Sequence, residues 1–157
     1  MDLQAQIQLL IDNAPKDGST PEIVTAIAPL LSAIASSLSY TQYYILRHLE
    51  SGWVMTTLSN RANPELVKRV IYAFPTIQDV PPSSSAGLDP QVIPVPMPVT
   101  HILFQLLAIE PVDSIVFFET SGTINNSVEV QRAELQRLVQ EQLQQNLLHN
   151  RIPPDIA

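Results

Sequence analysis

The sequence contains no cysteine, which excludes disulfides, thiolate nucleophiles and every zinc or iron–sulfur site built on cysteine ligands. Glycine is almost as scarce: its four residues stand far apart and cannot form a phosphate-binding loop or a dinucleotide fingerprint. The three histidines, His48, His101 and His149, lack the spacing of metal ligands. From these absences we expect neither a metal site nor a cofactor.

Basic residues are missing from the centre of the chain. Between Val70 and Gln131 there is no lysine or arginine, whereas six acidic residues fall in this stretch. A nucleic-acid-binding surface needs a basic stripe to displace counterions, so we expect no binding to nucleic acid. The net charge of −7 at pH 7 is typical of a solvated acidic surface that keeps a protein soluble.

A membrane span is not expected either. The stretch Ile23–Leu46 has no charge over 24 residues, which is long enough to cross a bilayer. Its many serine, threonine and glutamine side chains are too polar for the hydrocarbon interior. The first residues, "MDLQAQIQ", lack the positive charge of a signal peptide. We therefore predict a soluble protein that stays in the cytoplasm.

Size and composition predict a single domain. The chain has 157 residues, of which 45% are hydrophobic and 15% charged, so it can bury a core and does not have the composition of a disordered protein. We divide it into an N-terminal helix with its linker (residues 1–19), one domain (20–149) and a C-terminal tail (150–157). Within the domain, residues 81–98 form a proline-rich connection.

The first half of the chain predicts helices followed by a hairpin. A short amphipathic helix near the N-terminus precedes a second helix, whose start is marked by Thr20 and the proline after it. Pro29 is expected to kink or split this second helix. The strand-forming segments 43–46 and 53–59 flank a tight turn at Ser51–Gly52, which predicts a β-hairpin.

The segment Pro64–Phe74 has two interpretations. Asn63 as a cap, proline at the first position and apolar residues on one face predict a helix. Its second half, from Arg69, is rich in β-branched and aromatic residues and also predicts a strand. The local pattern favours the helix slightly, but short apolar runs are where such patterns are least decisive.

The second half of the chain predicts two more helices around a pair of strands. A helix begins at Thr100 and is closed by Pro111. The continuous apolar run "DSIVFFET" is typical of a buried strand, and "SVEV" after the turn "SGTINN" predicts a short second strand. Arg132–Leu148 is predicted as the final helix, with a glutamine-rich outer face.

The stretch "VIPVPMPVT" places a proline at every second position. Alternate residues of a strand direct their N–H groups to opposite edges, so Pro94, Pro96 and Pro98 remove the donors from one edge only. Ile93, Val95 and Met97 keep theirs, which predicts a strand that pairs on one side and refuses a neighbour on the other. A plain aliphatic loop and a polyproline ligand are the alternatives, although no two of these prolines stand three apart.

Two groups of polar residues are candidates for a site. His48 and Glu50 lie two apart, so on a strand they share a face and can form an acid–base pair, two metal ligands or a hydrogen-bonded surface pair. Four of the eight basic residues fall within 23 positions, and on one face of a sheet they would receive an acidic partner or a phosphate. These four are Arg47, Arg61, Lys68 and Arg69. The alternative is ordinary solvated strand charges.

If "KRVIYAF" is taken as a strand, the order of elements from Pro21 resembles the type III secretion chaperone-like fold. It is also similar to the small uncharacterised cyanobacterial-type proteins assigned to that superfamily. The segments that carry the resemblance are "TPEIVTAIAPLLSAIASSL", "YYILRHLESGWVMTTLSN", "KRVIYAF", "VTHILFQLLAI", "SIVFFET" and "AELQRLVQEQLQQNLL". The resemblance implies an α+β fold: helix, three-stranded antiparallel segment, helix, two strands and C-terminal helix, here with an extra N-terminal helix.

The resemblance also implies an acidic, homodimeric and non-enzymatic protein that holds an extended segment of a client on apolar patches. We therefore expect a protein-binding or chaperone-like module, a homodimer, with a protein partner. The expected partner-binding residues are the four basic residues above together with Ile93, Val95 and Met97. The alternative is a small-molecule enzyme or anion-binding protein that uses His48, Glu50 and the nearby basic residues.

Overall fold

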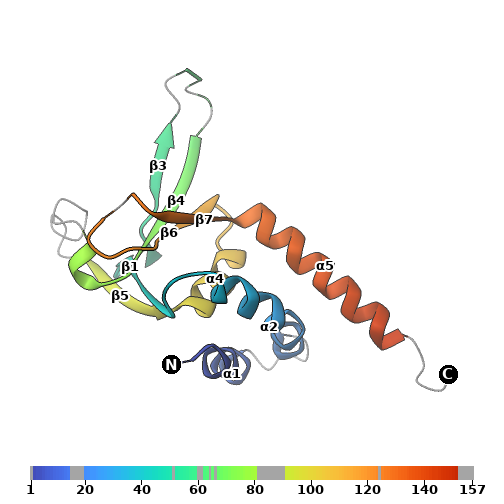
Figure 1. Cartoon of the computed structure of the whole chain (residues 1–157). Coiled ribbons are helices and arrows are strands. Elements are labelled where there is room, and N and C mark those ends of the chain that lie inside the picture. Colours follow the sequence, from blue (N-terminus) through green and yellow to red (C-terminus); the bar gives the residue numbers. More distant parts are fainter. Residues whose placement is uncertain are drawn as a thin grey trace.

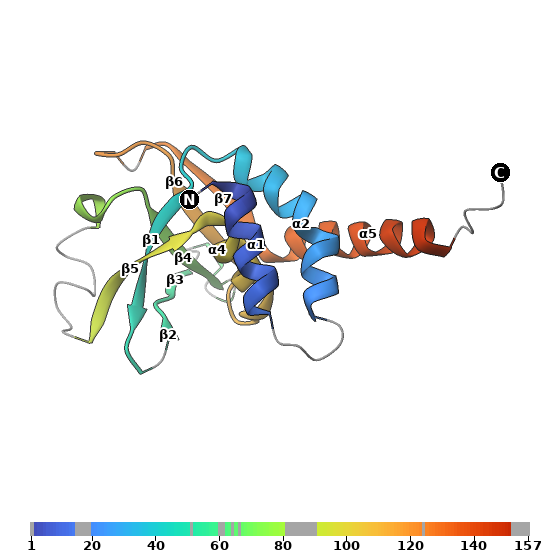
Figure 2. The same cartoon turned by 90° about the horizontal axis from the view of Figure 1, so that it is seen from below.

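The protein forms a layer of helices on one face of a single β-sheet (Figures 1 and 2). The computed structural model describes residues 2–14, 20–50, 52–59, 62–63, 65, 67–80, 91–123 and 125–151, with the side chains of 146–151 excepted. The α+β class and the extra N-terminal helix are confirmed. In the described ranges, every helix is too short or too polar to cross a membrane.

Four α-helices and one short 3₁₀-helix are described. The helices are α1 (Leu3–Asn13), α2 (Thr20–Ser36), α4 (Val99–Ala108), α5 (Arg132–Arg151) and the 3₁₀-helix η1 (Ile77–Asp79). The predicted start of α2 at Thr20 is confirmed, but the helix continues without a break through Pro29. The last helix extends three residues beyond the predicted end at Leu148, so residues 150 and 151 of the expected tail 150–157 are helical; residues 152–157 lie outside the described ranges.

The sheet has seven strands. They are β1 (Gln42–His48), β2 (Gly52–Trp53), β3 (Thr56–Ser59), β4 (Val67–Phe74), β5 (Val92–Pro98), β6 (Ser114–Phe118) and β7 (Ser127–Gln131). Strand β1 lies between β5 and β4, and β4 is followed by β6 and β7. All pairs are antiparallel except β4 with β6. The predicted hairpin is confirmed, but its second strand is interrupted: β2 pairs with β1, and β3 pairs with β4.

The slight preference for a helix over Pro64–Phe74 was wrong, because Val67–Phe74 forms β4. This strand has hydrogen-bonded neighbours on both sides, with β1 and β3 on one edge and β6 on the other. Its residues Val70, Ile71, Ala73 and Phe74 are buried. A strand covered on both faces has a continuous apolar run, which also fits a helix, and tertiary pairing decides between them.

The proline-rich connection was only partly right, since Val92–Pro98 is a full strand at the edge of the sheet. Hydrogen bonds from Val99 N–H to the Thr41 carbonyl and from Leu49 N–H to the Gln91 carbonyl, both 2.9 Å, set the phase of its pairing with β1. The backbone N–H and C=O groups of the odd-numbered residues of β5 therefore point toward β1, and the backbone positions of the prolines point to the outer edge. The one-sided pairing expected from the alternation is confirmed, and residues 81–90 lie outside the described ranges.

The core lies between the helices and the sheet. It joins residues of α2 and α4 with one face of β1, β4 and β6. Its largest fully buried members are Ile27, Leu31, Tyr43, Ile45, Ile71, Ile102, Leu103, Leu106, Ile115, Phe117 and Leu135. Burial of this apolar surface is the main force that holds the helices on the sheet.

Helix α1 is fastened to this body by a buried glutamine. Gln6 is only 1% exposed, and its Nε2 donates to the Thr41 carbonyl at 2.8 Å. Its Oε1 accepts hydrogen bonds from the backbone N–H and the hydroxyl of Thr100, at 3.1 and 2.8 Å. Thr100 lies in the first turn of α4, where N–H groups have no partner within the helix. Helix α1 therefore packs on the rest of the fold and caps α4.

A second buried polar contact joins the end of β6 to the loop after α2. The carboxylate of Glu119, 8% exposed, accepts a hydrogen bond of 2.5 Å from the Tyr43 hydroxyl and one of 3.0 Å from the Ser39 N–H. The Tyr43 ring also packs edge-on against Phe117, with 4.9 Å between centroids. Burial, and then the hydrogen bond and negative charge of Glu119, raise the pKa of Tyr43 far above its ordinary value.

The other end of α4 is capped by a side chain from α5. Arg132 donates from Nε to the Leu106 carbonyl at 3.1 Å and from Nη2 to the Leu107 carbonyl at 2.8 Å. These carbonyls belong to the last turn of α4, where acceptors lack partners and the helix dipole favours a cation. Arg132 therefore fixes α5 against α4 directly after β7 ends.

Replacement of Arg132 by methionine is expected to lower the free energy of unfolding by about 2 kcal/mol, because two charge-assisted hydrogen bonds to helix carbonyls are lost. Urea unfolding monitored by circular dichroism measures the change. The matched control is Arg137→Met, which removes a cation whose ion pairs with Glu134 and Glu141 are exposed and which should change stability little. Equal effects of the two replacements would contradict the capping role.

Candidate functional site

A groove of about 590 Å³ lies between the C-terminal part of α4 and the strands β1, β2 and β5. We call it the β1–α4 groove. Its lining residues are Arg47, Gly52, Trp53, Met55, Val95, Met97, Gln105, Ile109 and Pro111. It combines apolar side chains with one charged side chain, that of Arg47.

The strand register explains why these residues meet. In the antiparallel pairing of β1 with β5, Val95 lies opposite Ile45 and Met97 opposite Tyr43. Paired residues project from the same face of a sheet, and Ile45 and Tyr43 lie in the core under the helices. The half-buried side chains of Val95 and Met97 continue that apolar face outward, so the groove floor is an extension of the core.

Arg47 lies toward the open end of the same face. It pairs with Ile93 of β5 and with Trp53 of β2, and its side chain is exposed. Within the described residues Arg47 has no ion-pair partner. The groove therefore offers a tryptophan ring, methionine and aliphatic side chains beside one available guanidinium. Such a surface can hold apolar groups together with a carboxylate.

The structure separates the four basic residues that the sequence grouped. Lys68 projects from the opposite face of the sheet, where it forms an ion pair with Glu129. Arg69 is held by its backbone: its N–H donates to the Asp113 carboxylate, and its carbonyl accepts from the Asp113 N–H, both at 2.8 Å. Arg61 lies outside the described residues. Of the four, Arg47 is the one that lines the groove.

The three apolar residues predicted to bind a partner lie on one face of β5. Val95 and Met97 line the groove, and Ile93, which is 40% exposed, continues the strip to the position opposite Arg47. The contributions of Trp53, Gln105 and Ile109 were not predicted as part of a site. No local sequence pattern groups these three residues, because the side of α4 that borders the groove is set by how the opposite side of the helix packs into the core.

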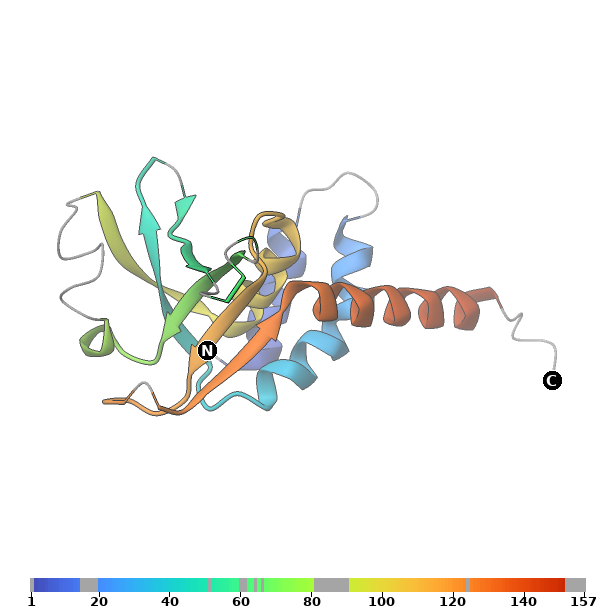
Figure 3. The same ribbon diagram turned by 90° about the horizontal axis from the view of Figure 1, so that it is seen from above.

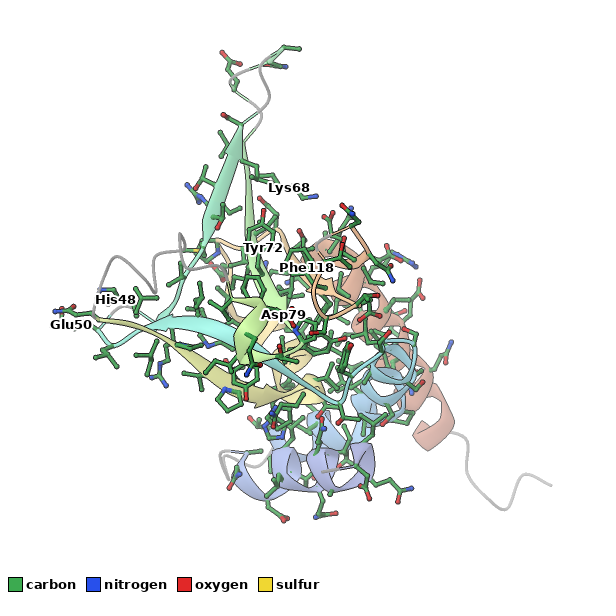
Figure 4. The ribbon with its side chains drawn as sticks, turned by 60° about the vertical axis from the view of Figure 1, so that its left-hand side comes forward. His48, Glu50, Lys68, Tyr72, Asp79 and Phe118 are labelled. Carbon is green, nitrogen blue, oxygen red and sulfur yellow. The ribbon has the colours of Figure 1, made fainter. Side chains whose placement is uncertain are left out.

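His48 and Glu50 lie at the turn between β1 and β2. The Nδ1 atom of His48 accepts a hydrogen bond of 3.1 Å from the backbone N–H of Glu50, so the contact observed joins imidazole to backbone rather than to carboxylate. Figure 4 shows both residues at the far end of β1, away from Tyr72 and Phe118. In the described part of the chain no three acidic or histidine residues are placed to hold a metal ion. The enzyme hypothesis gains no support from this arrangement.

The sheet face opposite the helices carries a cluster of aromatic rings. Tyr72 and Phe118 stack with 5.6 Å between centroids, and Phe74 and Phe118 with 5.3 Å. Figure 4 shows Tyr72, Phe118 and Lys68 along this side of the sheet. Phe74 and Phe118 are buried and Tyr72 is half-buried. The cluster was missed because Tyr72 and Phe74 share a face only if their segment is a strand.

Asp79 anchors one border of this aromatic face. Its carboxylate accepts hydrogen bonds from the N–H and hydroxyl of Thr76, the hydroxyl of Ser121 and the N–H of Gly122, at 2.7 to 3.2 Å. Burial raises the pKa of Asp79, but these hydrogen bonds outweigh it and hold the pKa below its ordinary value. The ionised carboxylate thus ties η1 to the turn between β6 and β7, which is a structural role.

Comparison with known proteins gives no relative: no family model matches the chain, and neither a curated protein nor a solved structure matches it significantly. The similarity to secretion chaperone-like proteins therefore stays a prediction. The function has to be inferred from the geometry of the β1–α4 groove.

Proposed function

We propose that the protein is a non-enzymatic binding module that holds an apolar segment of a protein partner in the β1–α4 groove. The observation that carries this proposal is the continuity of the core face into an open groove, with Trp53, Val95 and Met97 on its floor. Exposed apolar strips of this kind are typical of sites that bind proteins.

An extended segment fits this surface better than a compact small molecule. The apolar strip does not end with the groove but continues along β5 to Ile93, which lies opposite Arg47. A chain laid along the strip places successive side chains on Met97, Val95 and Ile93 in turn. The outward edge of β5 lacks N–H donors at its prolines, so the partner is held by side-chain packing and not by strand addition at that edge.

Charge adds a preference for an acidic residue in the partner. The protein as a whole carries a net charge of −7, which repels acidic segments in general. Arg47 is an available cation beside the apolar floor, and a bidentate contact with a carboxylate is the strongest that a guanidinium makes. The expected segment therefore has apolar residues at alternate positions and an aspartate or glutamate that reaches Arg47.

The replacement Met97→Glu tests the proposal. Peptides selected from a random displayed library on the wild-type protein serve as probes, and calorimetry gives their affinities. A glutamate on the groove floor should weaken binding at least tenfold, or about 1.4 kcal/mol, because a charge must be desolvated next to apolar side chains. Trp53, the only tryptophan, provides a second readout by fluorescence.

The matched control is Ile77→Glu, the same kind of change at an exposed apolar residue of η1, away from the groove. Its peptide affinities should equal those of the wild type. Arg47→Glu alters an exposed residue and should weaken acidic peptides more than neutral ones. The proposal fails if selection yields no peptide, or if the peptides bind the Met97→Glu protein as tightly as the Ile77→Glu protein.

A further inference from the structure

Strand β7 forms the second edge of the sheet and has free backbone groups. Hydrogen bonds from Glu119 N–H to the Asn126 carbonyl and from Arg132 N–H to the Asp113 carbonyl, both 2.8 Å, set the phase of its pairing with β6. The N–H and C=O groups of Ser127 and Glu129 and the N–H of Gln131 consequently point away from β6, whereas the Gln131 carbonyl accepts the first hydrogen bond of α5. No strand of the described chain lies on that side, and Figure 3 shows β7 at the border of the sheet, running into α5.

The two edge strands, β5 and β7, differ in whether their sequence blocks the addition of another strand. The outer edge of β5 is closed to strand addition by three prolines, whereas β7 contains neither proline nor a basic residue. Proteins normally block or cover an exposed edge, because it invites pairing with another chain. The open edge of β7 therefore needs an occupant.

The edge also carries an exposed apolar side chain, and a partly apolar cavity lies beside it. Val128 is 38% exposed. Two residues further along, Val130 lines a cavity of about 270 Å³ together with Ile34, Leu135 and Leu138, and with the polar residues Glu129, Gln131 and Glu134. Val128 and Val130 project from the same face of the sheet, the face that bears the helices.

We propose that β7 pairs antiparallel with β7 of a second copy of the chain, about a two-fold axis at Glu129. In this register Ser127 lies opposite Gln131 of the second copy: the two Glu129 residues exchange two N–H···O=C bonds, and the Gln131 N–H of each copy donates to the Ser127 carbonyl of the other. Val128 of each copy lies opposite Val130 of the other, at the mouth of its cavity. The two seven-stranded sheets become one continuous sheet.

A second copy fits this edge because the edge is complementary to itself. The exposed Val128 and the cavity beside Val130 are separated by two residues, and a two-fold axis between them places each against the other twice. The axis also brings the two Glu129 carboxylates together. Each is neutralised by Lys68 of its own chain, whose hydrogen bond is the main cause of the lowered pKa of Glu129.

A proline placed on the outward edge tests the pairing. Ser127→Pro puts a ring in place of an N–H that faces away from β6, so it obstructs a neighbouring strand as the prolines of β5 obstruct one at their own edge, and Ser127→Ala is its matched control. Sedimentation equilibrium at tens of micromolar should show dimers for the wild type and for Ser127→Ala, and folded monomers for Ser127→Pro. A monomeric wild type, or a Ser127→Pro protein that still dimerises, overturns the proposal.

Disulfide trapping tests the register and does not depend on the proline variant. The chain has no cysteine, so a covalent dimer can arise only from an introduced one. Residues 129 of the two copies would have Cα atoms about 5.5 Å apart, within disulfide range, whereas residues 128 would be offset by two positions, at about 8 Å. Oxidation should cross-link Glu129→Cys, and neither Val128→Cys nor the exposed control Leu49→Cys. Failure of Glu129→Cys to cross-link, or equal cross-linking of all three, overturns the proposal.

Discussion

Replacement of Gln6 by alanine is expected to lower the free energy of unfolding by about 3 kcal/mol, an unusually large effect for a polar residue in a short terminal helix. The Gln6 side chain makes hydrogen bonds to the Thr41 carbonyl and to the N–H and hydroxyl of Thr100. Truncation leaves the N–H and hydroxyl of Thr100 buried without this acceptor, at about 1–3 kcal/mol for each unsatisfied group before relaxation, while the Thr41 carbonyl keeps its hydrogen bond from the Val99 N–H. Urea unfolding at neutral pH measures the change.

The control for Gln6→Ala is Gln4→Ala, the same replacement at an exposed position of α1. It keeps helix propensity and residue type constant, so the difference between the two variants isolates the buried contacts. A second readout follows from the geometry. Because Gln6 supplies an acceptor to the first turn of α4, hydrogen exchange at the Thr100 amide should accelerate in Gln6→Ala but not in Gln4→Ala. Equal stability of the two variants would contradict the capping role of α1.

Replacement of Tyr43 by phenylalanine should cost about 2–3 kcal/mol near neutral pH. The Glu119 carboxylate loses the shorter of these two hydrogen bonds and stays buried with the one from the Ser39 N–H. Tyr44→Phe is the matched control, since Tyr44 is half-buried on the opposite face of the same strand. Thermal and urea unfolding compare the two.

The cost of Tyr43→Phe should decrease in alkaline solution. The pKa of Tyr43 is raised in the folded protein by burial and by Glu119, whereas in the unfolded chain the phenol titrates near its ordinary value of 10.0. The contribution of Tyr43 is therefore complete below about pH 10 and is lost above it, at up to about 1.4 kcal/mol for each pH unit, because the unfolded state releases a proton that the folded state retains. Unfolding at about pH 8 and about pH 11 measures this. An effect that is constant over this range would contradict the buried phenol–carboxylate contact.

The α+β class and many of the helices and strands could be predicted from local signals because the chain marks many of their boundaries, although the sheet has more strands than expected. Thr20 with its following proline starts α2, and the charge-free run before Glu119 marks β6. The proline alternation is the most informative local pattern, since it fixes which edge of β5 can pair before any partner is known. The phase seen in the pairing with β1 agrees with it.

The elements that were missed depend on distant residues. Val67–Phe74 is a strand because β1, β3 and β6 pair with it, and its own sequence does not decide between helix and strand. The same error hid the stacking of Tyr72 on Phe118, which requires both strands in their observed register. Gln6 carries no local sign of burial, because a glutamine in an amphipathic helix is usually exposed.

Part of the candidate site could be predicted, because strand alternation shows which side chains share a face. Val95, Met97 and Arg47 belong to two strands whose faces follow from alternation, and they do meet. Lys68 does not join them, because alternate residues of β4 project from opposite faces of the sheet and Lys68 lies on the face away from the helices. The wall contributed by Gln105 and Ile109 follows from the packing of α4 on the sheet, which no local pattern specifies.

The methionine methyl groups test the proposed function most directly. Two of the three methionines, Met55 and Met97, line the β1–α4 groove, so a spectrum of protein labelled with ¹³C at the methionine methyls contains two reporters of the groove. Titration with a selected peptide should shift the Met55 and Met97 signals in proportion to the bound fraction, and Met97→Glu should weaken the titration. A peptide that binds by calorimetry while both signals stay unchanged would contradict the account, because the bound segment would then lie elsewhere on the protein.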